Sequence, residues 1–353
     1  MSGKNCGRII VRKLLNTLYV TTADSYLSLD GETVVVSQGE TALGRIPLHN
    51  IEGIVYFGYK GASPALMGAC AERGIDLTFL TPGGRFLART CGPTRGNVVL
   101  RQTQLIWSCD PIHSAGLGRM FLIGKVYNSR WVIERTLRDH PQRVNKQLLL
   151  DAITRLKDTL ADLEDGVSLD GLMGLEGSAA KAYFDVFNEL ILRNKEGFRF
   201  CGRSRRPPLD AVNAMLSLCY TLLYSDVASA LETVGLDPCI GFLHQIRPGR
   251  KSLALDLIEE LRAPLADRFV LSLINLGSIV PGDFQTKENG AVYLKDDARQ
   301  KLLAAWQRHK QEQLTHPFLK EKIPWGLVPY AQAMLLARYM RGDLDAYPPF
   351  LWK

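Results

Sequence analysis

The stretch GFLHQIRPGRKSLALDLIEELR, residues 241–262, organises the rest of the chain. It places His244 just before a Pro-Gly turn, and an amphipathic helical pattern that carries Asp256 and Glu259 follows the turn. Imidazole nitrogen and carboxylate oxygen are ligands for divalent metals, and carboxylates suit Mg²⁺ or Mn²⁺. The turn is also basic, which suits the negative charge of phosphate. These residue types together indicate phosphodiester chemistry. The basic positions of the turn that could contact DNA are Arg247, Arg250 and Lys251.

The periodicity of this helix favours a simpler interpretation. Asp256 and Glu259 lie three residues apart, close to each other but away from the apolar positions. A solvated acidic face is therefore the better interpretation from spacing alone, and a single histidine is more often a structural residue than a ligand. A metal site stays one of two open interpretations. The apolar positions of the helix are Ala254, Leu257, Ile258, Leu261 and Leu265.

A second informative stretch is GLMGLEGSAAKAYFDVF, residues 171–187. Read as a helix, it stacks apolar residues on one face and places Glu176 in the middle of that face. An acid in that position is costly unless something pairs with it. Glu176 is either a buried glutamate bonded to a backbone amide or an arginine, or a metal ligand, and its surroundings in the sequence favour neither. Gly174 and Gly177 would let another backbone, or DNA, approach closely.

The third stretch, residues 203–220, begins with three arginines before two prolines. Clustered arginines before a rigid turn could clamp phosphates, or could pair with carboxylates of neighbouring helices. A stripe of polar residues follows in the next helical pattern, and it is more typical of an internal polar network than of a DNA contact. The arginines are Arg203, Arg205 and Arg206, and the stripe is Asn213, Ser217 and Tyr220.

Residues 118–126, GRMFLIGKV, weakly resemble a phosphate-binding P-loop. The stretch has one residue too many between its glycines, and Val126 stands where a serine or threonine should hold Mg²⁺. The pattern therefore excludes nucleotide hydrolysis.

The length and composition of the chain limit the number of domains, the location and the partners that we expect. The chain of 353 residues is long enough for two domains, and its 46% apolar content exceeds that of disordered chains. No segment is expected to reach the apolar length of a membrane span, and the N-terminus lacks an apolar signal core. The seven cysteines are scattered without a Cys-x-x-Cys pair, which predicts a reducing, cytoplasmic location. A net charge of +7 permits nucleic-acid binding without requiring it.

The pattern of elements predicts an α+β protein. Residues 8 to about 95 are mostly β, with an Asp30-Gly31 hairpin turn and one capped helix over residues 63–74. Helical patterns dominate from residue 97 onward, at 99–138, 142–164, 169–193, 209–233, 251–276, 296–314 and 328–341. We therefore expect a β-rich N-terminal domain, residues 1–95, and a larger all-α catalytic domain, residues 96–353.

Taken together, the three stretches resemble the CRISPR-associated adaptation endonuclease/integrase, the universal catalytic protein of spacer acquisition. The resemblance covers nearly the whole chain. The order of glutamate, arginine-proline turn, histidine and acid-bearing helix matches the family pattern, as does a small β-domain before a helical one. The most specific matches are Gly174-Leu-Glu176-Gly177, the stretch from Arg205 to Ala214, and Leu243 to Arg262.

The resemblance implies a metal-dependent DNA enzyme. Its metal ligands would fall on Glu176, His244 and Glu259, with Asp256 in support and Mg²⁺ or Mn²⁺ as the ion. It implies that 3′-hydroxyl ends of short captured double-stranded DNA are joined into the CRISPR repeat by transesterification. It also implies a homodimer made through the β-domain, and two such dimers bridged by a small second CRISPR adaptation protein.

Two other functions fit parts of the sequence. A general metal-dependent nuclease of branched DNA would use the same chemistry without joining DNA at the repeat. A non-catalytic DNA-binding scaffold would use only the basic residues at 203–206 and 247–251. Glu176 distinguishes the scaffold, because a pure DNA binder has no need for an acid on an apolar helix face.

Overall fold

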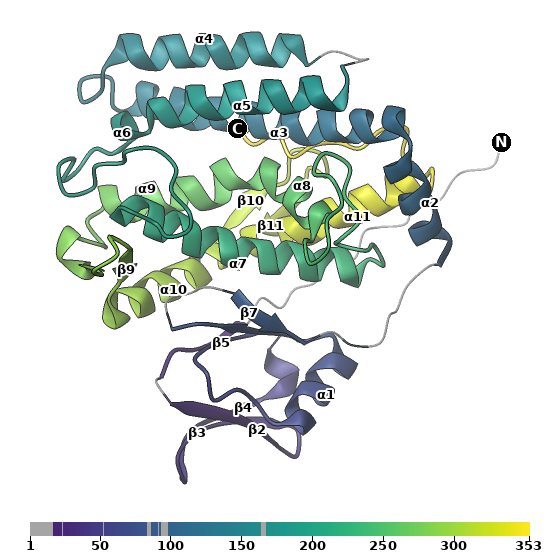
Figure 1. The fold of residues 1–353 in the computed structure, drawn as a ribbon, viewed down its shortest axis with the longest axis vertical. Coiled ribbons are helices and arrows are strands. Elements are labelled where there is room, and N and C mark those ends of the chain that lie inside the picture. The colour runs from purple at the N-terminus through teal and green to yellow at the C-terminus, as the bar shows by residue number, and fades with distance from the viewer. Residues whose placement is uncertain are drawn as a thin grey trace.

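The computed structural model describes residues 17–353, except for residues 23, 52, 83–85, 91, 93–97 and 164–166. A β-rich domain lies at one end of the molecule, and layers of helices lie above it (Figure 1). The elements of the β-rich domain are β1 (Thr17–Val20), β2 (Ser25–Asp30), β3 (Thr33–Gln38), β4 (Thr41–Pro47), η1 (Leu48–Asn50), β5 (Gly53–Phe57), α1 (Pro64–Arg73), β6 (Asp76–Leu80) and β7 (Phe86–Arg89).

These strands form two sheets. One is an antiparallel sheet of order β2-β3-β4, and the other has the order β1-β5-β6-β7, with β7 antiparallel to its neighbour. The predicted hairpin turn is confirmed, because Asp30 pairs with Thr33 and Gly31 has a φ of 57°. The predicted helix caps are confirmed too: the Ser63 hydroxyl accepts a hydrogen bond from the Leu66 amide at 3.2 Å, and Gly74 ends α1.

Strand β5 joins the two domains. All its residues are buried, and alternate side chains enter different cores. Ile54 and Tyr56 lie in the core of the β-rich domain, whereas Val55 and Phe57 lie in the core that fills the helical domain. Because strand side chains alternate between faces, one strand can complete two cores at once. The β1-β5-β6-β7 sheet therefore packs directly against the helical domain.

The helical domain contains one helix of 29 residues and a buried helix that carries Asp256 and Glu259. Its helices are α2 (Val98–Cys109), α3 (Pro111–Asp139), α4 (Lys146–Asp162), α5 (Leu169–Asp185), α6 (Phe187–Leu190), α7 (Ala211–Thr233), α8 (Ser252–Leu261), α9 (Arg268–Asn275), α10 (Asp296–Gln311) and α11 (Val328–Met340). A π-helical segment, η2 (Arg262–Asp267), links α8 to α9, and short 3₁₀ turns are η3 (Pro281–Asp283) and η4 (Trp325–Leu327).

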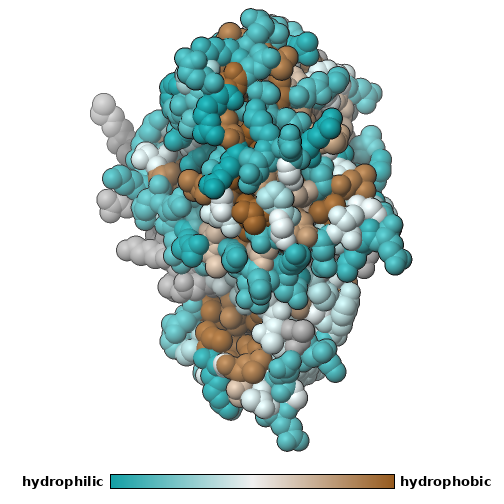
Figure 2. All heavy atoms as spheres, turned by 90° about the vertical axis from the view of Figure 1, so that its left-hand side faces the viewer, coloured by the Kyte–Doolittle hydropathy of each residue, from teal (hydrophilic) through white to brown (hydrophobic). Residues whose placement is uncertain are grey.

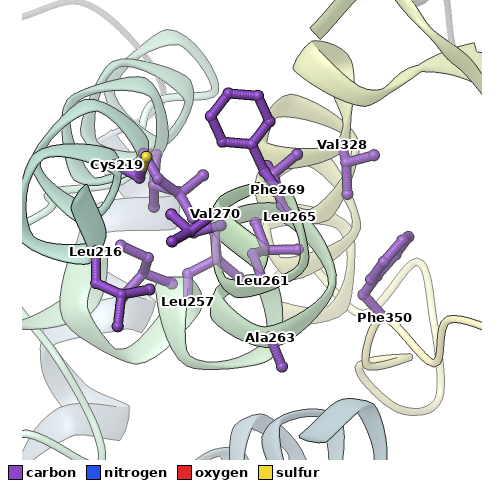
Figure 3. Packing of buried hydrophobic residues seen from close by; sticks show 14 of the residues in the cluster. Leu216, Cys219, Leu257, Leu261, Ala263, Leu265, Phe269, Val270, Val328 and Phe350 are labelled. Atoms are coloured by element: carbon purple, nitrogen blue, oxygen red, sulfur yellow. The ribbon is translucent and has the colours of Figure 1, made fainter. Parts of the chain in front are cut away.

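Helix α8 is enclosed on all sides. Every residue of α8 except Leu255 is buried. Leu257 and Leu261 of α8 pack beside Leu216 of α7 and Val270 of α9 (Figure 3). Burying a leucine side chain stabilises a fold by roughly 1.5–3 kcal/mol, so this packing fixes α8 firmly.

One prediction about the helical domain was wrong. It is not all-α, because β8 (Phe284–Thr286) pairs with β9 (Val292–Leu294), and β10 (Gln313–Thr315) pairs with β11 (Lys322–Pro324). These strands are short and lack a long alternating pattern. The helix predicted over 251–276 is confirmed, because α8, η2 and α9 follow one another without a break from Ser252 to Asn275, and the middle segment, which contains Pro264, is a π-helix. Proline lacks the amide proton of a regular helix and disturbs its hydrogen bonds.

Among the described residues, one helix meets the length and apolarity of a membrane span. That helix is α7, and 67% of its most apolar window is buried inside the protein. The expectation that no segment would reach this length was therefore wrong, because a helix buried in the core carries few charged residues. The outer surface in Figure 2 is mostly hydrophilic, and apolar atoms gather over the β-rich domain at the bottom of the view.

Candidate active site

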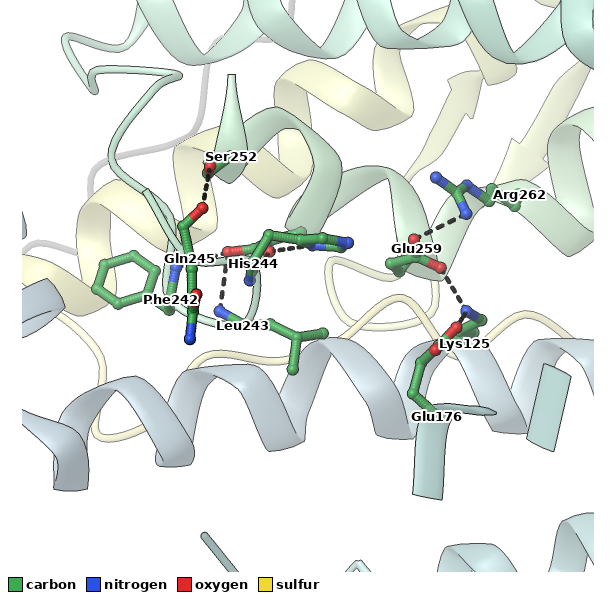
Figure 4. Close-up of polar contacts among 10 residues, drawn as sticks. Lys125, Glu176, Phe242, Leu243, His244, Gln245, Ser252, Glu259 and Arg262 are labelled. Carbon is green, nitrogen blue, oxygen red and sulfur yellow. Dashed lines mark hydrogen bonds and ion pairs between the residues drawn. The ribbon is translucent and has the colours of Figure 1, made fainter. Parts of the chain in front are cut away.

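Two carboxylates from different helices converge on one cation. Glu176 comes from α5 and Glu259 from α8, and the ammonium of Lys125 on α3 lies between them (Figure 4). The Lys125 Nζ atom is 2.7 Å from Glu259 Oε2 and also pairs with Glu176 Oε1. Glu176 lies on the packed face of α5, with 26% of its side chain exposed. Glu176 is thus paired, but with a lysine and not with the predicted backbone amide or arginine, and its interpretation as a metal ligand stays a prediction.

Glu259 is buried, with only 3% of its side chain exposed. Arg262 Nη1 lies 2.8 Å from its second oxygen, Oε1. Burial opposes ionisation, but the charges of Arg262 and Lys125 outweigh it and lower the pKa of Glu259 to about 2. The solvated acidic face expected from spacing is therefore wrong, because other elements cover both sides of α8.

Asp256 is fully buried and holds the loop that carries His244. Its Oδ2 accepts hydrogen bonds from the amides of Phe242 and Leu243, at 2.6 and 3.1 Å. Its Oδ1 accepts from the His244 amide at 2.8 Å and lies 2.6 Å from His244 Nδ1. With Nδ1 donating to the carboxylate, the lone pair of the imidazole lies on Nε2. Asp256 is therefore a positioning residue, and His244 extends toward Glu259 (Figure 4).

A close approach of α3 and α8 sets the spacing between Lys125 and Glu259. A side-chain carbon added to Gly124 would lie 2.7 Å from Glu260 Cβ, so only glycine fits there. Asn128 Nδ2 donates to the Glu260 carbonyl and to the Phe350 carbonyl, each at 2.7 Å. The Glu260 carboxylate accepts from the Phe350 amide at 2.9 Å. The C-terminal segment thus ties the two helices together.

The arginines that were predicted to clamp phosphates differ in their surroundings. Arg203 lies over the rings of Phe184 and Tyr220, 6.0 and 5.1 Å from their centroids, and it donates a hydrogen bond to Asn213. Arg203 and Arg205 both line a cavity of about 50 Å³ that Glu176 and Glu259 also line. Asn213 and Tyr220 form internal hydrogen bonds, as expected for a polar network, whereas the buried Ser217 hydroxyl has no partner among the described residues.

The other predicted basic residues do not line this cavity. The side chains of Arg206 and Arg247 are exposed, and Arg250 is half-buried. Lys251 lies 3.3 Å from Glu232 and lines a different cavity, of about 520 Å³, beside Arg89 and Asp76 of the β-rich domain. The basic turn after His244 therefore does not extend the carboxylate site, because Lys251 faces the β-rich domain.

The carboxylates of Glu176 and Glu259 and the imidazole of His244 are chemically suited to bind a divalent cation. Two carboxylates already hold a positive charge between them, and carboxylate with imidazole suits Mg²⁺ or Mn²⁺. As the side chains stand, no group of three His, Cys, Asp or Glu residues within the described part of the chain is close enough to hold a metal ion. Recruiting all of Glu176, His244 and Glu259 therefore requires side-chain movement.

Sequence reasoning missed two residues of this site. Arg262 could have been found, because it follows Glu259 by three residues, the spacing of ion pairs on a helix. Lys125 carries no such signal, since 51 residues separate it from Glu176. Only the packing of α3 against α5 and α8 brings it to the carboxylates.

The fold and the site define a class of proteins in which a β-rich domain supports a helical domain with convergent carboxylates. Solved structures share this fold. A casposase bound to an integration product is 24% identical, with a TM-score of 0.80 over 95% of this chain and 93% of that chain. A CAS1 protein from Thermotoga maritima is 21% identical, with a TM-score of 0.78 over 94% of this chain and 99% of that chain.

The chain belongs to the Cas1 family of CRISPR-associated proteins. The family described as CRISPR associated protein Cas1 matches residues 18–308. The CRISPR-associated endonuclease Cas1 1 of Chlorobaculum tepidum is 51% identical over 97% of this chain and 100% of its own length. The CRISPR-associated endonuclease Cas1 2 of Rhodospirillum rubrum is 50% identical over 97% of this chain and 100% of its own length. The resemblance seen in the three stretches is confirmed.

Proposed function

We propose that this protein is a metal-dependent DNA endonuclease and integrase of CRISPR adaptation. The observation that carries the proposal is the convergence of Glu176 and Glu259 on one cation, with His244 held beside them by Asp256. Membership of the Cas1 family supports it, since relatives of full length are named endonucleases. The resemblance of the motifs implies that the acids and the histidine of the family fall on these positions.

Glu176, His244 and Glu259 would hold the ion, which is Mg²⁺ or Mn²⁺. When bound, the ion supplies charge neutralisation at a phosphate and lowers the pKa of a hydroxyl. The chain supplies the rest. Asp256 keeps the His244 lone pair on Nε2, and the buried charge of Arg262 keeps Glu259 ionised. Arg203 and Arg205 border the same cavity and provide positive charge for DNA phosphates.

The reaction proposed is a transesterification. The 3′-oxygen of a captured duplex forms a new bond to phosphorus in the repeat, and the bond from that phosphorus to the repeat's own 3′-oxygen breaks. The proton of the attacking hydroxyl is lost and the leaving oxygen gains one, so that no net phosphodiester bond is consumed. Water replaces the 3′-hydroxyl in the hydrolytic version of the reaction.

The proposed partners are double-stranded DNA, a second copy of this chain and a small second CRISPR adaptation protein. Solved proteins of similar fold include a Cas6-RT-Cas1–Cas2 complex, 23% identical with a TM-score of 0.81 over 97% of this chain and 36% of that chain. The apolar atoms exposed over the β-rich domain support a homodimer at that end (Figure 2). Large side chains exposed on the described part of this domain include Tyr26, Leu43 and Tyr59, whose exposed fractions are 38%, 48% and 75%.

Strand joining in vitro tests the proposal. The purified chain and its small partner are mixed with a short duplex bearing 3′-hydroxyls, a supercoiled plasmid carrying a CRISPR repeat, and Mg²⁺ or Mn²⁺. We expect joined product from the wild type and none from Glu176→Gln, which keeps the shape of the side chain. Nicking without joining would indicate a general nuclease. DNA binding with neither reaction, equal in both proteins, would indicate a scaffold and overturn the metal assignment.

A further inference from the structure

Lys125 belongs to the stretch that weakly resembles a P-loop. In the structure residues 118–126 lie inside α3, and their glycines serve helix packing. Gly118 lies against Leu243, where an added carbon would be 3.4 Å from Leu243 Cβ, and Gly124 lies against Glu260. The lysine of this stretch therefore has a different task. Its side chain is only 12% exposed, and it reaches the space between α5 and α8 (Figure 4).

The charges around Lys125 balance. Its ammonium contacts both Glu176 and Glu259, and Arg262 contacts the remaining oxygen of Glu259. Two carboxylates thus face two cations. A divalent ion that used Glu176 Oε1 and Glu259 Oε2 would need the position of the Lys125 ammonium, because Nζ contacts both of these oxygens, and Arg262 contacts the other oxygen of Glu259. A divalent ion and the Lys125 ammonium placed next to each other in this buried site would repel each other strongly.

We infer that Lys125 is a resident counter-ion of the carboxylate pair, which competes with the divalent ion and is displaced when that ion binds. The inference rests on the proposed function, and it adds to the site a residue that opposes ion binding. Without the ion, the Lys125 ammonium neutralises the repulsion between the carboxylates of Glu176 and Glu259. Its flexible four-carbon side chain allows the ammonium to withdraw without movement of α3.

The test is Mn²⁺ affinity of the full chain, measured by calorimetry without DNA. Lys125→Met removes the competing charge and keeps the bulk of the side chain. It should bind Mn²⁺ roughly tenfold or more tightly than the wild type, the size expected for one charge-assisted contact. Lys181→Met is the matched control, because the Lys181 ammonium pairs with Asp185 at 2.8 Å on an exposed part of α5. This control should keep the wild-type affinity.

The outcomes separate the inference from the proposed function. Wild-type or weaker Mn²⁺ binding by Lys125→Met would overturn the inference alone. Binding of Mn²⁺ by Glu176→Gln with wild-type affinity, or no binding by the wild type, would overturn the proposed function.

Should Lys125→Met fail to fold, acetylation of wild-type lysines followed by mass spectrometry decides the question. Saturating Mn²⁺ should raise the labelling rate of Lys125 severalfold and leave Lys181 unchanged. An unchanged rate at Lys125 would contradict displacement.

Discussion

Gly124→Ala should destabilise the protein by driving α3 and α8 apart. The added carbon would lie 2.7 Å from Glu260 Cβ and 3.1 Å from its Oε2, both closer than packed side chains allow. Because Glu260 Cβ is next to the backbone of α8, the strain cannot be relieved by a rotamer change at the end of the side chain. Overpacking of this kind costs about 1–3 kcal/mol, against a gain of about 1 kcal/mol when alanine replaces glycine inside a helix.

Gly116→Ala is the control, since Gly116 lies in the same helix with nothing within 4 Å of the added carbon. Both variants share the gain in helix propensity, so their unfolding free energies should differ by the overpacking cost alone, about 1–3 kcal/mol. Urea unfolding followed by circular dichroism measures this difference. Mn²⁺ affinity of Gly124→Ala should also fall, because α5 packs against α3, so that Glu259 on α8 moves away from Glu176 on α5. Equal stability of the two variants would refute the close approach of α3 and α8.

Three further predictions concern other parts of the molecule. Asp256→Asn should lower strand joining at least about tenfold, because an amide cannot accept all the hydrogen bonds that hold the His244 loop, and a folded variant with full activity would contradict this role. His316 is buried with a pKa lowered to about 4, and its Nδ1 accepts hydrogen bonds from two backbone amides. Its contribution to stability should be complete above pH 6.5 and be lost as the pH falls toward 4. Unfolding free energies at pH 7 and pH 5 should therefore show a loss of up to about 2 kcal/mol that His316→Gln lacks, and parallel pH profiles of the two proteins would argue against it. The double variant Arg205→Ala with Arg206→Ala should bind DNA more weakly and lower the salt slope of binding by about two, whereas an unchanged slope would place the DNA elsewhere.

Local features of the fold could be predicted because they depend on neighbouring residues. The Asp30-Gly31 turn and the capped helix over residues 63–74 both lie where the pattern places them. The short strands at β8 to β11 were missed, because a strand of three residues is too short to show a period of two.

The candidate site could be predicted in part from the sequence motifs, and the rest of it depended on the tertiary structure. The order of Glu176, His244 and Glu259 along the chain, together with their surrounding motifs, determined the family to which this protein belongs. Periodicity misplaced Asp256 and Glu259 on a solvated face, because a helical pattern records which residues share a side and does not record what covers each side. Only the tertiary structure buries both acids, with Asp256 as the support of His244 and Glu259 beside Arg262. It alone brings Lys125 between the carboxylates, because contacts between distant segments depend on how whole helices pack against one another.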